Sequence, residues 1–143
     1  MEATETRLFV YGSLKAGFEH HGRMRGARFE AAAATAYGYR LVVLEGYPAL
    51  VAGAGAGSVR GELYWVKLEL LEALDRFEDC PELYQRHPIA LADGSAAQAY
   101  SISAQRAGLC PEIPGGAWTQ HSSARSGCEG YFRSDMGTKR RSS

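Results

Sequence analysis

The stretch Leu8-Phe9-Val10-Tyr11-Gly12-Ser13-Leu14 decides how this chain folds. Its apolar and aromatic residues predict a buried strand, and Gly12-Ser13 predicts that the strand ends in a tight turn. A loop at the end of a buried strand presents backbone N–H groups from a rigid support. We therefore expect this loop to hold a ligand, whose nature has to come from the rest of the chain.

Composition narrows the class of ligand. The 143 residues, 45% of them hydrophobic, are enough for one domain with its own core. Lys+Arg and Asp+Glu both number 16, so no net charge favours nucleic acid or an anionic membrane. No apolar run approaches the roughly 20 residues of a membrane span. We expect a cytoplasmic protein that binds a small molecule, as a monomer or weak homodimer.

The chain divides into a domain over residues 1–118 and a tail over residues 119–143. The tail is rich in Ser, Gly and Arg and is net basic, so we expect it to be disordered. Cys80, Cys110 and Cys128 are widely spaced and form no C-x-x-C pair, which predicts reduced thiols without a disulfide framework or a zinc site. The adjacent His20-His21 pair lacks further ligands at suitable spacing, so we expect a solvated loop and no metal.

The rest of the domain reads mostly as strands. Composition favours a helix over residues 28–35 but the length between turns favours a strand, and this choice stays open. The Gly-x-Gly run of residues 53–57 does not predict a dinucleotide site, because an alternating strand follows it where a helix would be needed. The expected strands, the last two joined by an Asp93-Gly94 turn, are residues 39–44, 49–51, 59–66, 84–91 and 96–103.

Residues 67–78 form the clearest predicted helix. At about 100° per residue, one face holds Leu70, Leu71, Leu74 and Phe77. Glu78 falls within the same apolar arc, where an unpaired carboxylate costs several kcal/mol or so, or is protonated. Two interpretations remain open at this point: a structural or solvated glutamate at a helix end, or an acid that works chemically.

An ordered set of short motifs resembles the gamma-glutamylcyclotransferase-like family, most closely its small gamma-glutamylamine cyclotransferase-type members. The resemblance covers Arg7 to Trp118, and order and spacing carry it, since no block is specific alone. It implies an α+β fold, a small mixed-sheet β-barrel with packed helices. The motifs are residues 9–14 with Lys15 and Gly17, then residues 38–41, 47–50, 59–64, 74–78, 84–86 and 113–118.

The resemblance also implies a reaction, in which a gamma-glutamyl amine or amino acid closes into 5-oxoproline and releases an amine. It assigns the catalytic base to Glu78 and the binding of the glutamyl head group to Tyr11, Gly12, Ser13 and Leu14. Tyr84 is a weaker candidate, equally explained as a core tyrosine or as a substrate contact. Neither a metal nor an organic cofactor is required.

This chemistry explains both sites. The substrate's α-amine, with a pKa near 7.7–8.0, is mostly protonated at neutral pH and must lose a proton before it attacks the γ-carbonyl. A glutamate with the usual pKa of about 4.3 is a weak base, and burial of Glu78 is expected to raise that pKa. A rigid loop that holds the substrate folded contributes an orientation effect of up to roughly 7–11 kcal/mol. The loop's N–H groups suit either the α-carboxylate or the oxyanion at the γ-carbonyl.

Two positions depart from the family pattern. Relatives often have glycine after the catalytic acid, where this chain has Asp79, whose charge would raise the pKa of the acid further. They often have asparagine where this chain has His20, which bears on the leaving group accepted. The alternatives are a non-catalytic gamma-glutamyl or amino-acid binding module of the same fold and, with less support, a thiol hydrolase using Cys80 or Cys110 with His87.

Overall fold

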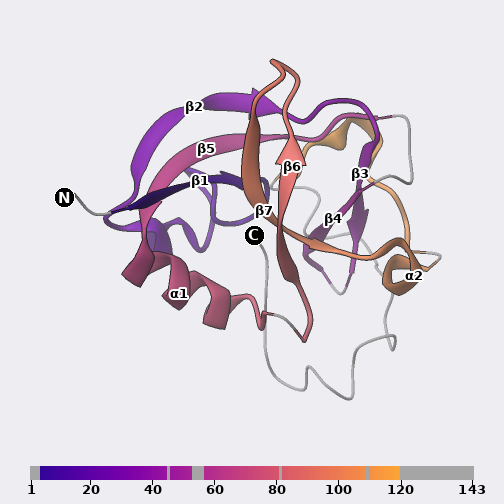
Figure 1. Ribbon diagram of the computed structural model, residues 1–143. Coiled ribbons are helices and arrows are strands. Elements are labelled where there is room, and N and C mark those ends of the chain that lie inside the picture. Colours follow the sequence, from indigo (N-terminus) through magenta and orange to yellow (C-terminus); the bar gives the residue numbers. More distant parts are fainter. Residues whose placement is uncertain (1–3, 45, 53–56, 81, 109, 120–143) are drawn as a thin grey trace.

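The computed structural model describes residues 4–44, 46–52, 57–80, 82–108 and 110–119 (Figure 1). Apart from Thr119, the tail expected to be disordered lies outside these residues. The helices are α1 (Leu68–Phe77) and α2 (Ala104–Ala107), with 3-10 turns η1 (His21–Met24) and η2 (Pro114–Gly116). The strands are β1 (Glu5–Val10), β2 (Arg28–Ala34), β3 (Tyr39–Val43), β4 (Pro48–Ala52), β5 (Arg60–Lys67), β6 (Gln85–Ala90) and β7 (Ala96–Ile102).

The seven strands of the described residues belong to one mixed sheet, which confirms the predicted α+β class. The order is β2-β5-β1-β7-β4-β3, and β6 pairs with β7. β1 runs antiparallel to β5 but parallel to β7, so the strand that carries the Gly12 loop is central. The open choice over residues 28–35 resolves as a strand, because β2 pairs along β5. This long-range pairing fixes the segment as a strand, because its alanines have little intrinsic preference for strand structure.

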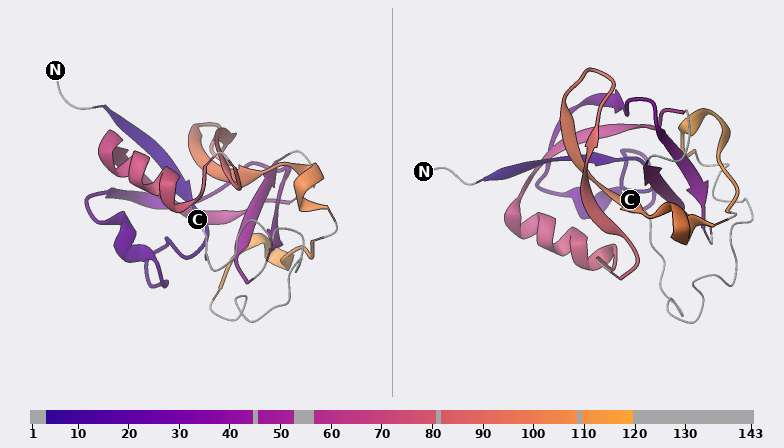
Figure 2. Two further views of the ribbon diagram at one scale, coloured as in Figure 1. Left: turned by 90° about the horizontal axis from the view of Figure 1, so that it is seen from below. Right: turned by 45° about the vertical axis from the view of Figure 1, so that its right-hand side comes forward.

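The sheet curves strongly but does not close, so the expected barrel is wrong (Figures 1 and 2). Its two end strands, β2 and β3, do not pair with each other. The outer edge of β3 is occupied instead, since the N–H of Ile113 donates to Leu41 O at 2.8 Å. The gap between β2 and β3 is spanned by Gly57 to Val59. There, Thr35 N donates to Val59 O and Gly38 N donates to Gly57 O. Closure depends on contacts distant in sequence, which the motifs do not specify.

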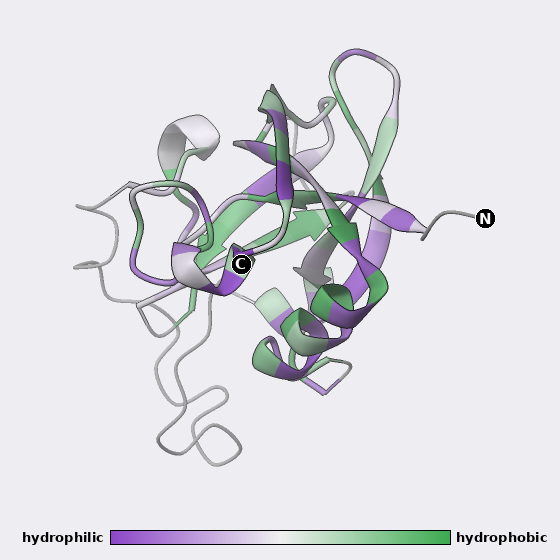
Figure 3. Ribbon diagram, turned by 90° about the vertical axis from the view of Figure 1, so that its left-hand side faces the viewer, coloured by the Kyte–Doolittle hydropathy of each residue, from purple (hydrophilic) through white to green (hydrophobic). Residues whose placement is uncertain are grey.

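Apolar side chains fill both faces of the sheet. Leu71 and Leu74 of α1 pack on one face with Leu8 and Val66, and Figure 3 shows the green apolar side of this helix turned to the sheet. The other face buries Phe9, Leu63 and Trp118 among others. This division follows the period-2 alternation of β1. Among the described residues, no helix is long and apolar enough to cross a membrane.

The cysteines differ in state. Cys80 is a free thiol, whereas Cys110 is disulfide-bonded. The prediction of reduced thiols is therefore wrong for Cys110. A disulfide requires two β-carbons to meet in space, which a sequence separation alone does not reveal.

Candidate functional site

The loop after β1 is held in place by its own hydrogen bonds. Lys15 N donates to Gly12 O at 3.1 Å, and His20 N donates to Ser13 O at 2.9 Å. The Ser13 hydroxyl is hydrogen-bonded to Nδ1 of His20 at 2.6 Å, and Nδ1 of His21 to Leu14 O at 2.7 Å. The two histidines thus fold back on the loop, rather than remaining solvated side chains as the sequence suggested.

Lys15 connects the same loop to the end of the described chain. Its ammonium donates to Trp118 O at 2.8 Å and lies 4.7 Å from the centroid of the Phe18 ring. Burial lowers the pKa of Lys15, and the nearby Glu62 carboxylate opposes that effect. Sequence reasoning gave Lys15 no role, because its partner is a backbone carbonyl more than a hundred residues away.

The candidate acid, Glu78, lies at the C-terminal end of α1. The helix ends in a Schellman arrangement, in which Cys80 N donates to Asp75 O at 2.9 Å and Asp79 N to Arg76 O at 3.1 Å. Glu78 is the C-cap residue and is fully buried, with an exposed fraction of 0%. The helix phase therefore predicted the burial of Glu78 correctly, and a solvated side chain is excluded.

Asp75, Arg86 and Tyr100 form a polar group beside Glu78. The Arg86 guanidinium donates to both carboxylate oxygens of Asp75, at 2.8 and 3.0 Å, and the Tyr100 hydroxyl donates to Asp75 at 2.6 Å. Burial raises the pKa of Tyr100, and the charges of Asp75 and then Glu78 add to that rise. The carboxyl of Glu78 thus lies within electrostatic reach of the Tyr100 phenol.

Contacts between side chains bring the loop to the acid. The rings of His20 and Phe77 lie edge to face with 5.2 Å between centroids, and the Arg23 guanidinium lies 4.1 Å from the centroid of the same Phe77 ring. Leu14 of the loop belongs to the buried cluster that also contains Leu74 of α1. Phe77 directly precedes Glu78, so these contacts join the loop to the C-terminal end of α1.

The two candidate tyrosines use their hydroxyls inside the protein. Tyr11, which packs on the opposite face from Leu14, donates to Tyr100 O at 2.5 Å and accepts from Leu50 N at 3.0 Å. Tyr84 packs in the cluster with Leu14 and donates to Pro48 O at 2.6 Å. Both are completely buried. These contacts make each tyrosine a support of the site in this structure.

Comparison with known proteins identifies the family. The sequence pattern of the family described as gamma-glutamyl cyclotransferase, AIG2-like, matches residues 8–120, most of the chain and both halves of the site. The chain belongs to this family. Gamma-glutamylaminecyclotransferase A of Danio rerio is 36% identical over 110 residues, covering 67% of this chain and 68% of that protein. Gamma-glutamylaminecyclotransferase of Homo sapiens is 41% identical over 90 residues, covering 55% and 57%.

A solved member of the AIG2-like family has the same fold. The AIG2-like protein of Mus musculus superposes with a TM-score of 0.59 at 32% identity, covering 68% of this chain and 77% of that chain. The chain thus spans between about half and about two thirds of the length of the gamma-glutamylaminecyclotransferases quoted above.

One departure from the family pattern has a structural explanation. Asp79 has a φ of +55°, the left-handed conformation at the residue after a helix C-cap. Glycine adopts this conformation without strain, and aspartate is among the few other residues that tolerate it. The glycine that relatives often have after the acid is therefore consistent with the backbone, and this chain keeps the same turn with Asp79.

The thiol hydrolase alternative has no geometric basis among the described residues. Burial raises the pKa of the Cys80 thiol, which disfavours the thiolate needed for attack. Cys110 is in a disulfide, and the ring of His87 is exposed and hydrogen-bonded to the side chain of Gln85 at 2.9 Å. No thiol and imidazole are paired within the described part of the chain.

Proposed function

We propose that the chain is a cyclotransferase that converts a gamma-glutamyl amine or amino acid into 5-oxoproline and a free amine. The substrate's α-amine nitrogen bonds to its own γ-carbonyl carbon, and the carbonyl becomes an oxyanion. When the oxyanion collapses, the bond from that carbon to the leaving nitrogen breaks. The α-ammonium loses one proton before the attack and a second as the lactam forms, and the leaving nitrogen takes up two to depart as an ammonium, so a single shuttle can serve each transfer.

Glu78 is the proposed shuttle. The observation that carries this role is its complete burial directly after Phe77, whose ring contacts His20, in a chain whose relatives are named gamma-glutamylaminecyclotransferases. A carboxylate without solvent binds a proton more readily than one in water, which suits it to deprotonate an ammonium. Asp75 cannot take this role easily, because Arg86 and Tyr100 already engage its oxygens.

The loop is the proposed glutamyl-binding element. Its shape is fixed by the Ser13–His20 and Lys15–Trp118 hydrogen bonds, so its backbone groups need little rearrangement when a substrate arrives. Gly12, Ser13 and Leu14 bind the substrate through backbone N–H groups, and Tyr11 and Tyr84 hold the walls. Because nucleophile and electrophile belong to one molecule, orientation supplies much of the rate gain.

The test is product formation from a panel of substrates. Gamma-glutamyl amines, gamma-glutamyl amino acids and an ε-linked gamma-glutamyl-lysine are incubated with the protein, and 5-oxoproline is measured by chromatography. Turnover of at least one compound is expected. Folded protein that converts none of them would refute the activity and would leave the non-catalytic binding module, which predicts ligand-dependent stabilisation without product.

Substitution of the acid tests the mechanism. Glu78→Gln is expected to lower kcat by roughly 10²–10⁴-fold with a smaller change in KM, because it removes the shuttle and keeps the shape. Glu72→Gln is the matched control, since Glu72 is an exposed glutamate of the same helix. A Glu78→Gln protein as active as the parent would exclude Glu78 as the base.

A further inference from the structure

A large pocket opens where the sheet fails to close. It has a volume of about 630 Å³, within the roughly 300–1,000 Å³ typical of ligand pockets. Its walls come from both end strands, β2 and β3, and from the two segments that span the gap between them, residues 57–61 and 112–116. Neither Glu78 nor the Gly12 loop contributes to its lining. We call this the seam pocket.

The charges in the seam pocket are unbalanced. Arg40, Arg60 and Glu112 all line it, which leaves one positive charge in excess. The ion pairs among the described residues are Arg7–Glu30, His20–Glu19, Arg28–Glu5 and Arg86–Asp75. None of them involves a charged residue of the pocket, so both guanidinium groups remain without a carboxylate partner there.

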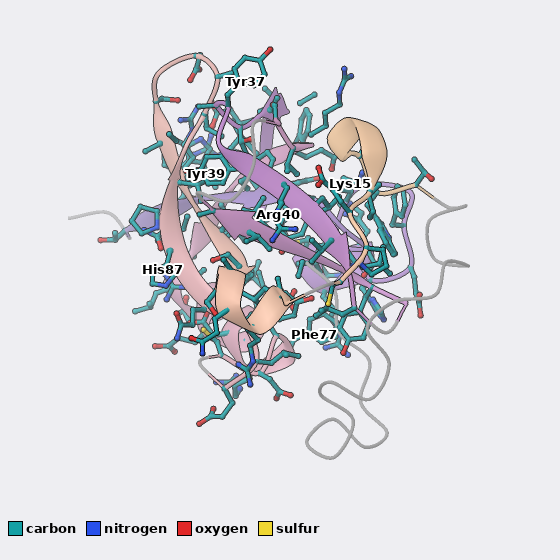
Figure 4. All side chains as sticks on the ribbon, turned by 90° about the vertical axis from the view of Figure 1, so that its right-hand side faces the viewer. Lys15, Tyr37, Tyr39, Arg40, Phe77 and His87 are labelled. Carbon is teal, nitrogen blue, oxygen red and sulfur yellow. The ribbon has the colours of Figure 1, made fainter. Side chains whose placement is uncertain are left out.

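Arg40 is the strongest indication of a ligand. Its Nε is buried and has no hydrogen-bond partner among the described residues. A buried donor without a partner is uncommon, and a charged one is costly, because the surroundings screen its charge less than water does. In Figure 4, Arg40 lies below Tyr37 and Tyr39 and above Phe77. An oxyanion bound to the Arg40 guanidinium would supply an acceptor.

The remaining walls are suited to a small molecule. The Tyr39 hydroxyl accepts from Ala90 N at 2.9 Å, which leaves its own proton available for donation. Gly116 holds η2 tightly against the gap, since a β-carbon there would lie 2.0 Å from Ser58 O. Gly115, at the pocket rim, has nothing within 4 Å of its β-carbon position. The pocket therefore combines a fixed wall with open space.

We propose that the seam pocket binds a small organic anion through Arg40 and Arg60, at a site separate from the Glu78 site. Guanidinium groups match both carboxylate and phosphate oxygens, so either group fits this chemistry. The site does not depend on the proposed cyclotransferase activity. The protein would then have a second binding site besides its candidate reaction centre. Its ligand would be an effector or the anionic end of an extended substrate.

The test is a titration followed by NMR of the backbone amides. Inorganic phosphate and glutarate are added separately at constant ionic strength, with chloride as the reference anion. Saturable shifts of the Gly61, Gly115 and Gly116 amides are expected, with a Kd of about 1 mM or tighter for at least one anion. Saturable binding of phosphate, of glutarate or of both shows whether the pocket prefers a phosphate or a carboxylate group.

Variants assign the binding to the two arginines. Arg40→Met and, separately, Arg60→Met are expected to weaken Kd at least about tenfold, with native-like spectra. Lys67→Met, an exposed cation at the opposite end of β5, is expected to leave Kd within about twofold, and Glu78→Gln is expected to leave it unchanged. Absence of saturation, shifts confined to the Gly12–Leu14 amides, or undiminished binding by both arginine variants would overturn the proposal.

Discussion

The imidazole ring of His20 stands edge-on to the ring of Phe77, with 5.2 Å between the two centroids. The same imidazole is hydrogen-bonded to the Ser13 hydroxyl at 2.6 Å. Because Phe77 directly precedes the buried Glu78, one side chain links the loop proposed to bind the glutamyl group with the acid proposed to move the proton. The distance between the two halves of the site therefore depends on His20.

Replacing His20 by alanine should loosen the loop relative to the acid. We expect kcat/KM to fall about tenfold, corresponding to about 1.4 kcal/mol of lost transition-state stabilisation, since misplaced reacting groups lose rate steeply. Steady-state kinetics on the best substrate of the panel measures the effect. His87→Ala is the control, because His87 is an exposed histidine on β6 whose ring is hydrogen-bonded to the side chain of Gln85, away from the loop and the acid.

His20→Asn separates a positioning role from a simple loss of volume. Asparagine is the residue often found here in relatives, and its amide can still bond the Ser13 hydroxyl. We expect this variant to keep most of the parent's kcat/KM while His20→Ala does not. If both substitutions leave kcat/KM unchanged, the link through His20 has no role in turnover.

Tyr84→Phe tests whether this tyrosine supports the site or contacts substrate. Its hydroxyl donates to Pro48 O at 2.6 Å in the buried interior, so its removal leaves a carbonyl without that partner. We expect a loss of about 1 kcal/mol in the free energy of unfolding, measured by urea denaturation, with KM within about twofold of the parent. A large rise in KM without loss of stability would instead assign Tyr84 to substrate binding.

Asp79→Gly should stabilise the protein. Asp79 has a φ of +55°, which costs most residues energy and costs glycine almost none. We expect the free energy of unfolding to rise by about 0.5–1 kcal/mol, whereas Asp79→Ala should lower it, because alanine lacks the short polar side chain that eases this conformation. A glycine variant less stable than the parent would show that the contacts of the Asp79 side chain outweigh the backbone strain.

Local patterns in the sequence account for much of the fold. The alternation of residues 59–66 predicted β5, and the apolar face of residues 67–78 predicted α1 nearly to the residue. The alanine-rich β2 has no such pattern, and only its pairing with β5 decides it. Long-range contacts also decide that the sheet does not close into a barrel. Ile113 N donates to Leu41 O at the edge of β3, and Val59 O accepts from Thr35 N.

In the candidate site too, local patterns predicted some features, and contacts between distant residues decided the others. Burial of Glu78 could be inferred because helical geometry is local and periodic. The Ser13–His20 bond could not, because it depends on the path of a loop without periodicity. Arg86 and Tyr100 were likewise missed as neighbours of the acid, since each comes from a different strand and reaches Asp75 only in the folded protein.

Stability should depend on pH through Glu30. Arg7 donates to both of its carboxylate oxygens, and these hydrogen bonds hold the pKa of Glu30 below its usual value of 4.5. The ionised form is thus favoured in the folded protein, so this contribution is present above pH 4.5 and is lost as pH falls through the lowered pKa. Urea denaturation should find Glu30→Gln less stable than the parent at about pH 7, with a smaller difference at about pH 3.

Glu72→Gln is the matched control for that experiment, because Glu72 is exposed and takes part in none of the ion pairs among the described residues. Its stability should follow the parent at both pH values. A Glu30→Gln protein that is equally destabilised at about pH 3 would show that the effect does not come from ionisation.

Gly61 should tolerate no side chain. A β-carbon there would lie 2.3 Å from Val10 O and 2.7 Å from the ring of Phe9, where β5 runs antiparallel beside the end of β1. Since the backbone of a central strand cannot move away cheaply, Gly61→Ala should cost about 3 kcal/mol and lower Tm by roughly 10 °C. Gly22→Ala is the control, because nothing lies within 4 Å of its β-carbon position, and it should stay within about 0.5 kcal/mol of the parent. An equally stable Gly61→Ala protein would mean that β5 lies farther from the end of β1. The packing that supports the Gly12 loop would then also be looser.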